Sequence, residues 1–322
     1  MSARAGKIVV VGSLNMDIVV KTSRFPERGE TLSGQEVHFH PGGKGANQAV
    51  ACARQGHETV MLGAIGEDAF GSSLAESLES SGVDTRYLLT KPGVATGIAS
   101  ITLAEQDNSI VVVPGANGAL TPDDVMAWQP VISEAAIMLI QFEIPMEVVS
   151  AAVHAAHKAG VKVILNPAPA CEIPEDLVKK VTYITPNQSE LHAITGIDPS
   201  ADGLESAMDA LLARGPEFVV ATLGSRGAAW KERGGSLRRA ATHHVDVVDT
   251  TGAGDAFNGG LACSLAINRE IGDNVKHGIA VSALAVTKFG AQDGMPTLQE
   301  VELFKSVHEN EGSCHDSNKN DH

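Results

Sequence analysis

Short apolar runs rich in valine and isoleucine recur along the chain, separated by segments with helical spacing. The runs are KIVVVGS (7–13), TVMLGAIG (59–66), AIMLIQFE (136–143), VKVILNPAP (161–169), VTYITPN (181–187) and FVVATLG (218–224). A continuous short apolar run predicts a strand that is buried on both faces. Helical spacing of apolar residues follows at 44–56, 146–160 and 203–215. This alternation predicts an α/β fold, with a central, mostly parallel sheet flanked by helices on both faces.

Two segments depart from this alternation. Residues 30–40 mix polar and apolar positions, and residues 96–115 read as two strands joined by EQDN. They predict a small antiparallel β lid outside the main sheet, although a decorative insertion or a dimer contact would have the same pattern. We therefore expect a single catalytic domain, 1–308, with lid strands inserted at about 18–40 and 95–115. A polar, aperiodic tail at 309–322 is predicted to be disordered.

Composition and charge exclude several classes of partner. The 322 residues carry a formal net charge of −15, which repels nucleic acid and anionic membranes. The first apolar run is too short for a signal peptide, and no stretch reaches the length of a membrane span. The four cysteines lie far apart, with no zinc spacing. We expect a cytoplasmic protein that binds neither nucleic acid nor membrane.

The stretch DTTGAGD (249–255) is the strongest candidate for chemistry. It precedes an apolar segment with helical spacing, so Asp255 is expected in the first turn of a helix. Free backbone N–H groups at a helix start attract an anion, and glycine lets that anion approach closely. An aspartate there is also a common helix cap. Beside a phosphate site, however, its carboxylate could accept the proton of an attacking hydroxyl, as phosphoryl transfer requires.

Other polar clusters fall where predicted strands end or helices begin. These are GSLNMD (12–17), GGKGANQA (42–49), Phe142-Glu143, NPAPA (166–170), TPNQSE (185–190) and TLGSRG (222–227). Ligands of open α/β sheets bind outside the carboxyl ends of the strands, so a shared cleft is predicted. Neither GxxxxGK[ST] nor a strand followed by GxGxxG occurs, which disfavours a P-loop enzyme and a dinucleotide dehydrogenase.

These motifs, in this order, resemble the ribokinase family of carbohydrate kinases (PfkB-type) over residues of about 7–305. Both family signatures are present, the first beginning at GGKGANQA and the second being DTTGAGD. Within the family, the motifs are most similar to those of enzymes that act on ribose. The resemblance implies ATP-dependent phosphorylation of D-ribose at its 5-hydroxyl. It also implies a homodimer that pairs through the lid.

The resemblance assigns roles by position. Asp255 would be the catalytic base, and the backbone of Gly252, Ala253 and Gly254 would form the anion hole. The sugar would be bound by Asn15, Asp17, Gly42, Gly43, Lys44, Asn47, Glu143 and Asp255. The nucleotide would be bound by Asn187, Thr222, Gly224, Ser225, Gly227, Gly254 and Ile279. Relatives often have asparagine where this chain has Ile279, and His277 lies two residues earlier.

Two cations are implied as well. Asn187 and Glu190 would arrange Mg²⁺ or another divalent cation with ATP, through water. An activating K⁺ would be held by Asp249, Thr251, Ala285, Lys288, Gly290 and Gly294. Relatives often have serine where this chain has Gly294, so we expect one ligand fewer, or a water in its place.

Alternatives remain at this point. A kinase of 2-deoxyribose, another pentose or a nucleoside would use the same catalytic parts. A 1-phosphofructokinase would need additional cationic side chains near the lid, and no obvious set is present. A sugar sensor without catalytic activity would not need Asp255, the glycine turn and Asn187 with Glu190 together. An oxidoreductase is disfavoured by the missing glycine fingerprint.

Overall fold

The computed structural model describes residues 6–105, 107–200, 202–267 and 269–316. Its main layer is an eight-stranded sheet in the order β14-β13-β12-β11-β10-β9-β1-β4. The bounds are β1 Ile8–Val11, β4 Thr59–Leu62, β9 Ile137–Ile140, β10 Lys162–Leu165, β11 Tyr183–Ile184, β12 Phe218–Thr222, β13 Ala228–Glu232 and β14 Arg238–Ala240. In this sheet, the neighbouring strands β4, β1, β9, β10, β11 and β12 pair in parallel. The last two strands, β13 and β14, pair antiparallel with their neighbours. The predicted fold class is confirmed.

Helices cover both faces of this sheet because successive strand side chains point to opposite sides. In β1, Ile8 and Val10 pack into one core, and Val9 and Val11 pack into the other. The first core includes α1 Lys44–Arg54, α2 Ala69–Ser80, α8 Ala253–Ala266, α9 Ile271–Ala285 and α10 Leu298–Asp316. The second includes α3 Pro122–Ser133, α4 Met146–Lys158, α5 Glu175–Val178, α6 Gln188–Thr195 and α7 Gly203–Ala213. No helix in the described part of the chain is long and apolar enough to cross a membrane.

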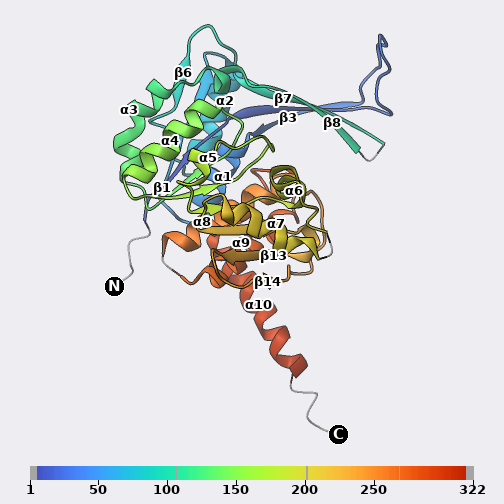
Figure 1. Ribbon diagram of the computed structural model, residues 1–322. Helices are drawn as coiled ribbons and strands as arrows, with labels where there is room; N and C mark the ends of the chain where they lie inside the picture. The colour runs from blue at the N-terminus through green and yellow to red at the C-terminus, as the bar shows by residue number, and fades with distance from the viewer. Residues whose placement is uncertain (1–5, 106, 201, 268, 317–322) are drawn as a thin grey trace.

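A separate four-stranded sheet has the order β3-β2-β7-β8. Its strands are β2 Asn15–Lys21, β3 Glu36–Gly42, β7 Gly97–Ala104 and β8 Asp107–Val113. The expected antiparallel sheet is present, but it also contains one parallel pair, β2 with β7. In Figure 1, β3, β7 and β8 project beyond the helical layers. A short pair, β5 Ala64–Gly66 with β6 Leu89–Lys91, and the turns η1 Gly115–Ala119 and η2 Gly224–Arg226 complete the fold.

The last helix differs from the sequence prediction. We expected disorder from residue 309, whereas α10 extends to Asp316. Helix propagation costs little once a helix has been nucleated, so a polar sequence without apolar periodicity can continue one. Residues 317–322 of the predicted tail lie outside the described residues.

The start of α1 lies directly against the end of β1 at Gly45. A Cβ atom on Gly45 would lie 2.6 Å from both the carbonyl carbon of Gly12 and the backbone nitrogen of Ser13. Those are backbone atoms, so they cannot move aside as a flexible side chain would. Because Gly45 has no side chain, the start of α1 can approach the end of β1 closely.

We expect Gly45→Ala to lower the free energy of unfolding by about 1–3 kcal/mol, because the added methyl group forces the backbone apart. Thermal unfolding followed by circular dichroism would measure this. Gly272→Ala is the matched control, since a Cβ there meets only Trp230 Cζ2, at 3.4 Å. Its melting temperature should stay the same or rise slightly. Equal melting temperatures for the two variants would contradict the close-contact explanation.

Candidate active site

Asp255 lies in the first turn of α8 and is 6% exposed. One carboxylate oxygen, Oδ2, accepts a hydrogen bond from Asn47 Nδ2 at 2.9 Å, and the other, Oδ1, accepts one from Gln48 Nε2 at 3.0 Å. Burial raises the pKa of the Asp255 carboxyl above its ordinary value. The positive charge of Lys44 opposes that rise, as do both amide hydrogen bonds. The result is a fixed carboxylate whose affinity for protons is increased, as a general base requires.

Lys44 is the cation of this region. Its backbone N–H donates to Glu143 Oε2 at 3.0 Å, and Ser13 Oγ donates to the same oxygen at 2.5 Å. Burial lowers the pKa of the Lys44 amine, but nearby carboxylates outweigh burial and raise it overall. Those carboxylates are Asp255, Glu143, Glu190 and Asp17. The fold thus gathers four predicted carboxylates from distant parts of the chain around one ammonium group.

Asp17 lies on β2, beside the end of β3. A Cβ atom on Gly42 would lie 2.3 Å from Asp17 Oδ2, so the carboxylate fits only against a glycine. Burial, together with the negative charges of Glu143 and Asp255, raises the pKa of Asp17 to about 7. Asn15, also on β2, is buried and accepts a hydrogen bond from Asn117 Nδ2 at 2.9 Å. Asn15 and Glu143 line a cavity of about 420 Å³ that is also lined by Val112 of β8.

The turn before α8 presents backbone to a second cavity, of about 240 Å³. Gly252 caps the helix with φ 76°, a left-handed conformation that favours glycine. Gly254 has open space where a side chain would be. The N–H of Ala253 donates to the carbonyl of Thr250 at 3.2 Å in this state. The cavity is also lined by Lys44, Asn166, Asn187, Glu190, Thr222, Asp255 and Asn258.

A third cavity, of about 120 Å³, continues from this turn, and we call it the nucleotide groove because most of the residues predicted to bind a nucleotide line it. It is lined by Thr222, Gly224, Gly227, Thr242, Ala253, Gly254, Phe257, Ile279 and Ser282. Ser225 lies in the same 3₁₀ turn, with an exposed side chain, but does not line the groove. Gly43, which was predicted to bind the sugar, does not line this groove and is the N-cap residue of α1. Most of the predicted nucleotide residues therefore lie along one depression that leads from the start of α8 to α9.

Asn187 and Glu190 form a capping box at the start of α6. Asn187 Oδ1 accepts from the backbone N–H of Glu190 at 2.8 Å, and Glu190 Oε2 accepts from that of Asn187 at 2.8 Å. This arrangement stabilises a helix by itself. Burial also raises the pKa of the Glu190 carboxyl. Within the described residues, no three His, Cys, Asp or Glu side chains gather closely enough to hold a metal ion.

Asp249 joins the two loops predicted to hold a monovalent cation. Its Oδ1 accepts from the backbone N–H of Thr251 at 2.9 Å, and its Oδ2 accepts from that of Gly290 at 2.9 Å. Although burial acts in the opposite direction, these hydrogen bonds lower the pKa of Asp249, so it stays ionised. The turn continues through Lys288, whose N–H donates to the carbonyl of Ala285 at 3.4 Å. A Cβ on Gly294 would lie 2.7 Å from that same carbonyl oxygen.

Comparison with known proteins agrees with this geometry. A family model described as "pfkB family carbohydrate kinase" matches residues 5–298. The chain belongs to the pfkB family of carbohydrate kinases. It is 40% identical over 296 residues to a ribokinase of Lactococcus lactis, covering 92% of this chain and 95% of that protein. It is 33% identical over 305 residues to a deoxyribokinase of Salmonella typhi, covering 94% and 99% respectively. The predicted resemblance is confirmed.

A solved structure of a pfkB-type relative is similar along nearly the whole chain. The structure of Arabidopsis thaliana ribokinase complexed with ribose and ATP superposes with a TM-score of 0.88 at 33% identity. The match covers 93% of this chain and 98% of that one. The chain is therefore an ATP-dependent carbohydrate kinase by family, and the predicted enzyme class is confirmed.

Sequence reasoning about this kinase named Asn47 but missed Gln48, the other residue that holds the predicted base. Gln48 is fully buried and donates both to Asp255 and to Asn166 Oδ1, the latter at 3.1 Å. Gln141 Nε2 donates to Gln48 Oε1 at 2.6 Å. Gln48 lies inside the GGKGANQA motif, so the motif carried a signal, but its partners are about 90–210 positions away. Ser282, whose hydroxyl donates to the carbonyl of Ala253 at 2.9 Å, had no such signal.

Proposed function

We propose that this chain transfers the γ-phosphoryl group of ATP to the 5-hydroxyl of D-ribose. The observation that carries the proposal is the buried Asp255 carboxylate, held by two amides, at the helix start that also lines the cavity of about 240 Å³. The ribokinases among its relatives, and the ribose and ATP in the Arabidopsis complex, support the choice of substrates. A deoxyribokinase relative keeps 2-deoxyribose as the second candidate acceptor.

Asp255 would act as the general base. As the 5-oxygen of the sugar forms its bond to the γ-phosphorus, the hydroxyl proton passes to the Asp255 carboxylate, and the bond to ADP breaks. The two amides from α1 would hold the carboxylate in one orientation, so little reorganisation is needed. Lys44 and the backbone N–H groups at residues 252–254 would stabilise the negative charge on the transferring group. Ala253 would first release its N–H from the Thr250 carbonyl.

Asn15, Asp17, Asn47 and Glu143 would bind the sugar hydroxyls. Each hydroxyl offers a donor and an acceptor, which carboxylates and amides can satisfy. Gly42, Gly43 and Lys44 would line the same site. A polar site that expects a hydroxyl rejects a substrate lacking it, because its own groups are left unpaired. The 2-hydroxyl of ribose is therefore expected to distinguish ribose from 2-deoxyribose.

The nucleotide and its divalent cation would lie along the nucleotide groove. Thr222, Gly224, Ser225, Gly227 and Ile279 would contact ATP. Mg²⁺ neutralises phosphate charge when bound, and it takes oxygen ligands while keeping several waters. An amide and one carboxylate, Asn187 and Glu190, offer oxygen atoms of the kind that such a site needs, and waters and phosphate oxygens would supply the remaining ligands.

A K⁺ site beside the glycine turn is a further part of this proposal. The ionised Asp249, with the carbonyls of Thr251, Ala285, Lys288 and Gly290, offers the oxygen ligands that a monovalent cation takes. Gly294 has no side-chain ligand to offer, so a water would take that position. The cation would act electrostatically by fixing the loop that carries Thr251 and the turn.

A homodimer through the lid is also proposed. The exposed apolar side chains on its edge strands are Val37, Phe39, Ile110, Val111, Val112 and Val113, each about half exposed. An exposed apolar patch of this kind marks an interaction surface. Its position on β3 and β8 leaves both edges of the small sheet available to a second copy.

Initial rates of ADP formation would test the function. D-ribose, 2-deoxyribose, fructose and adenosine would be compared at constant ionic strength, in KCl and in NaCl. We expect ribose to give the highest kcat/KM and K⁺ to raise it. Preference for 2-deoxyribose would change the substrate while keeping the mechanism, and an equal rate in NaCl would remove the K⁺ assignment. No turnover with any acceptor would favour a sugar sensor.

A further inference from the structure

Gln292 is a buried polar side chain to which the proposed reaction gives no role. It lies in the segment between α9 and α10. Its Nε2 donates to Asn47 Oδ1 at 3.2 Å, and its Oε1 accepts from Ser77 Oγ of α2 at 3.2 Å. Asn47 in turn donates to Asp255 Oδ2. These hydrogen bonds form a continuous relay that runs from α2, through the segment after α9 and through α1, to the proposed base.

The carboxylate determines the direction of every hydrogen bond in this relay. An ionised carboxylate only accepts, so Asn47 must turn its NH₂ group toward Asp255. The Asn47 oxygen then faces the other way, and because it is buried it needs a donor. Gln292 supplies that donor, and the Ser77 hydroxyl fixes the Gln292 amide in the orientation that does so. Reversing either amide would bring two acceptor oxygens together.

The other oxygen of Asp255 is held in the same way. Gln48 donates to Asp255 Oδ1, and Gln141 donates to Gln48 Oε1. Each carboxylate oxygen is therefore held by an amide whose own oxygen accepts from a second glutamine. A substrate proton has to be accepted at a lone pair that the amides leave free. The two relays together thus limit the directions from which Asp255 can take a proton.

The segment that carries Gln292 is also attached to α1 without the help of that side chain. Arg54 is the last residue of α1, and its Nη1 donates to the carbonyl of Met295 at 2.9 Å. Gln55, the C-cap residue, donates from Nε2 to the carbonyl of Pro296 at 2.8 Å. These contacts hold the segment against α1 whether or not residue 292 can donate a hydrogen bond.

We propose that Gln292 is a positioning residue for phosphoryl transfer, which fixes the Asn47 amide so that its NH₂ group, and not its oxygen, faces Asp255. The base is then held in one orientation toward the attacking hydroxyl, and little reorganisation is needed in the transition state. Asn47 keeps a second N–H that it can donate to the sugar. This inference rests on the proposed function, since it takes Asp255 as the base.

Gln292→Met tests the role, because methionine fills a similar volume but cannot donate. We expect kcat to fall about tenfold, since the hydrogen bond from Asn47 to a charged group is weakened or reversed. Initial rates would be measured with the acceptor that gives the highest kcat/KM. In the Asp255→Asn background, the same substitution should change the residual kcat less than about twofold, because no base remains to be positioned.

The pH profile of kcat is a second measurement, and a loss of stability alone would not move it. Burial raises the pKa of Asp255, and the Asn47 hydrogen bond opposes that rise. When Gln292→Met weakens this hydrogen bond, the fall of log kcat toward acid pH should therefore begin at a higher pH than in the wild type. The other charged groups that act on Asp255 are unchanged in this variant, namely Lys44, Glu143, Asp17 and Glu190.

Gln55→Met is the matched control. Gln55 is also buried and also donates to the segment after α9, but from the opposite end of α1 to Asn47. Its kcat and its pH profile should equal those of the wild type, and melting curves would show what stability each variant loses. Equal kcat in Gln292→Met and Gln55→Met, or an equal loss with and without the Asp255 carboxylate, would overturn the proposal.

Failure of the proposed function would give a different result. If the wild type has no turnover, or if Asp255→Asn keeps full kcat, the base assignment is wrong and the role of Gln292 is lost with it. A large loss in Asp255→Asn with none in Gln292→Met overturns the positioning role alone. If Gln292→Met does not fold, Ser77→Ala replaces it, because it removes only the donor that fixes the Gln292 amide. Its kcat should fall about threefold, and an unchanged kcat would contradict the relay.

Discussion

Replacing Asp255 with asparagine is expected to lower kcat by about 10²- to 10⁴-fold, while the affinity for the sugar changes little. The amide has nearly the same shape but cannot accept the hydroxyl proton. Initial rates give kcat, and titration calorimetry gives the dissociation constant of ribose. In the wild type, log kcat should fall as the pH drops through the raised pKa of Asp255, because protonation inactivates the base.

Asp123→Asn is the control for the capping explanation of an aspartate in a first helical turn. Asp123 occupies that position in α3, is exposed, and undergoes the same chemical change. Its kcat should equal that of the wild type. Loss of ribose binding together with kcat in Asp255→Asn would instead assign Asp255 a structural role. Melting curves of both variants separate that outcome from unfolding.

The main sheet could be predicted from the sequence because its strands are buried on both faces. All six apolar runs contain a strand, and the run at 59–66 contains two, β4 and β5. The antiparallel strands β13 and β14 were missed. Their sequences, AAWKE and RRA, mix polar with apolar residues, as strands toward the edge of a sheet do. The parallel pairing of β2 with β7 could not be predicted, since it joins strands about 80 residues apart.

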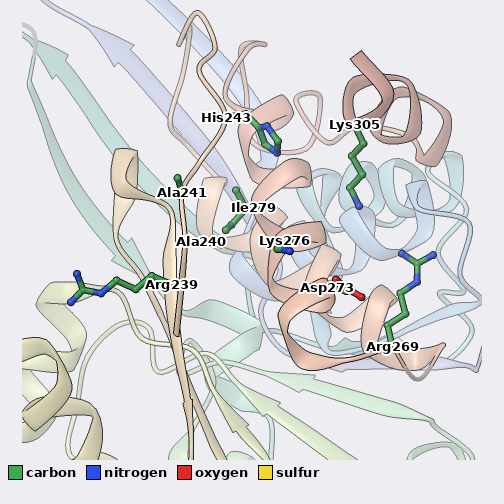
Figure 2. A pocket seen from close by; sticks show the side chains of 9 residues that line it. All are labelled: Arg239, Ala240, Ala241, His243, Arg269, Asp273, Lys276, Ile279 and Lys305. Atoms are coloured by element: carbon green, nitrogen blue, oxygen red, sulfur yellow. The ribbon is translucent and has the colours of Figure 1, made fainter. Parts of the chain in front are cut away.

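The candidate site was predictable where chemistry and backbone geometry are local. The turn before Asp255 needs glycine and a helix start, and both are visible in seven consecutive residues. The support for that carboxylate is not local, because Gln48 and Asp255 are 207 positions apart. The cavity between the end of β14, α9 and α10 is the extreme case (Figure 2). Its lining residues Arg239, Lys276 and Lys305 are far apart in the sequence, and only the packing of these three elements brings them together.

Asp17→Ala is expected to raise the KM for ribose about 100-fold or more, because hydrogen bonds to a charged group contribute about 1.5–3 kcal/mol each. Asp17 is the residue we expect to bind two sugar hydroxyls. Its kcat at saturating ribose should fall much less than in Asp255→Asn. Initial rates over a range of ribose concentrations separate the two parameters. An unchanged KM would show that Asp17 does not contact the sugar.

The titration of Asp17 gives an independent check on stability. Its pKa is about 7 in the folded protein and 3.8 ordinarily. Between those values the folded state binds more protons than the unfolded state, so this group's contribution to stability is full below pH 4 and is lost as pH rises to 7. Asp17→Asn removes that dependence. Its melting temperature relative to the wild type should therefore rise from pH 4 to pH 8. Parallel profiles would mean that the Asp17 carboxyl titrates normally, and the argument from its burial among Glu143 and Asp255 would fail.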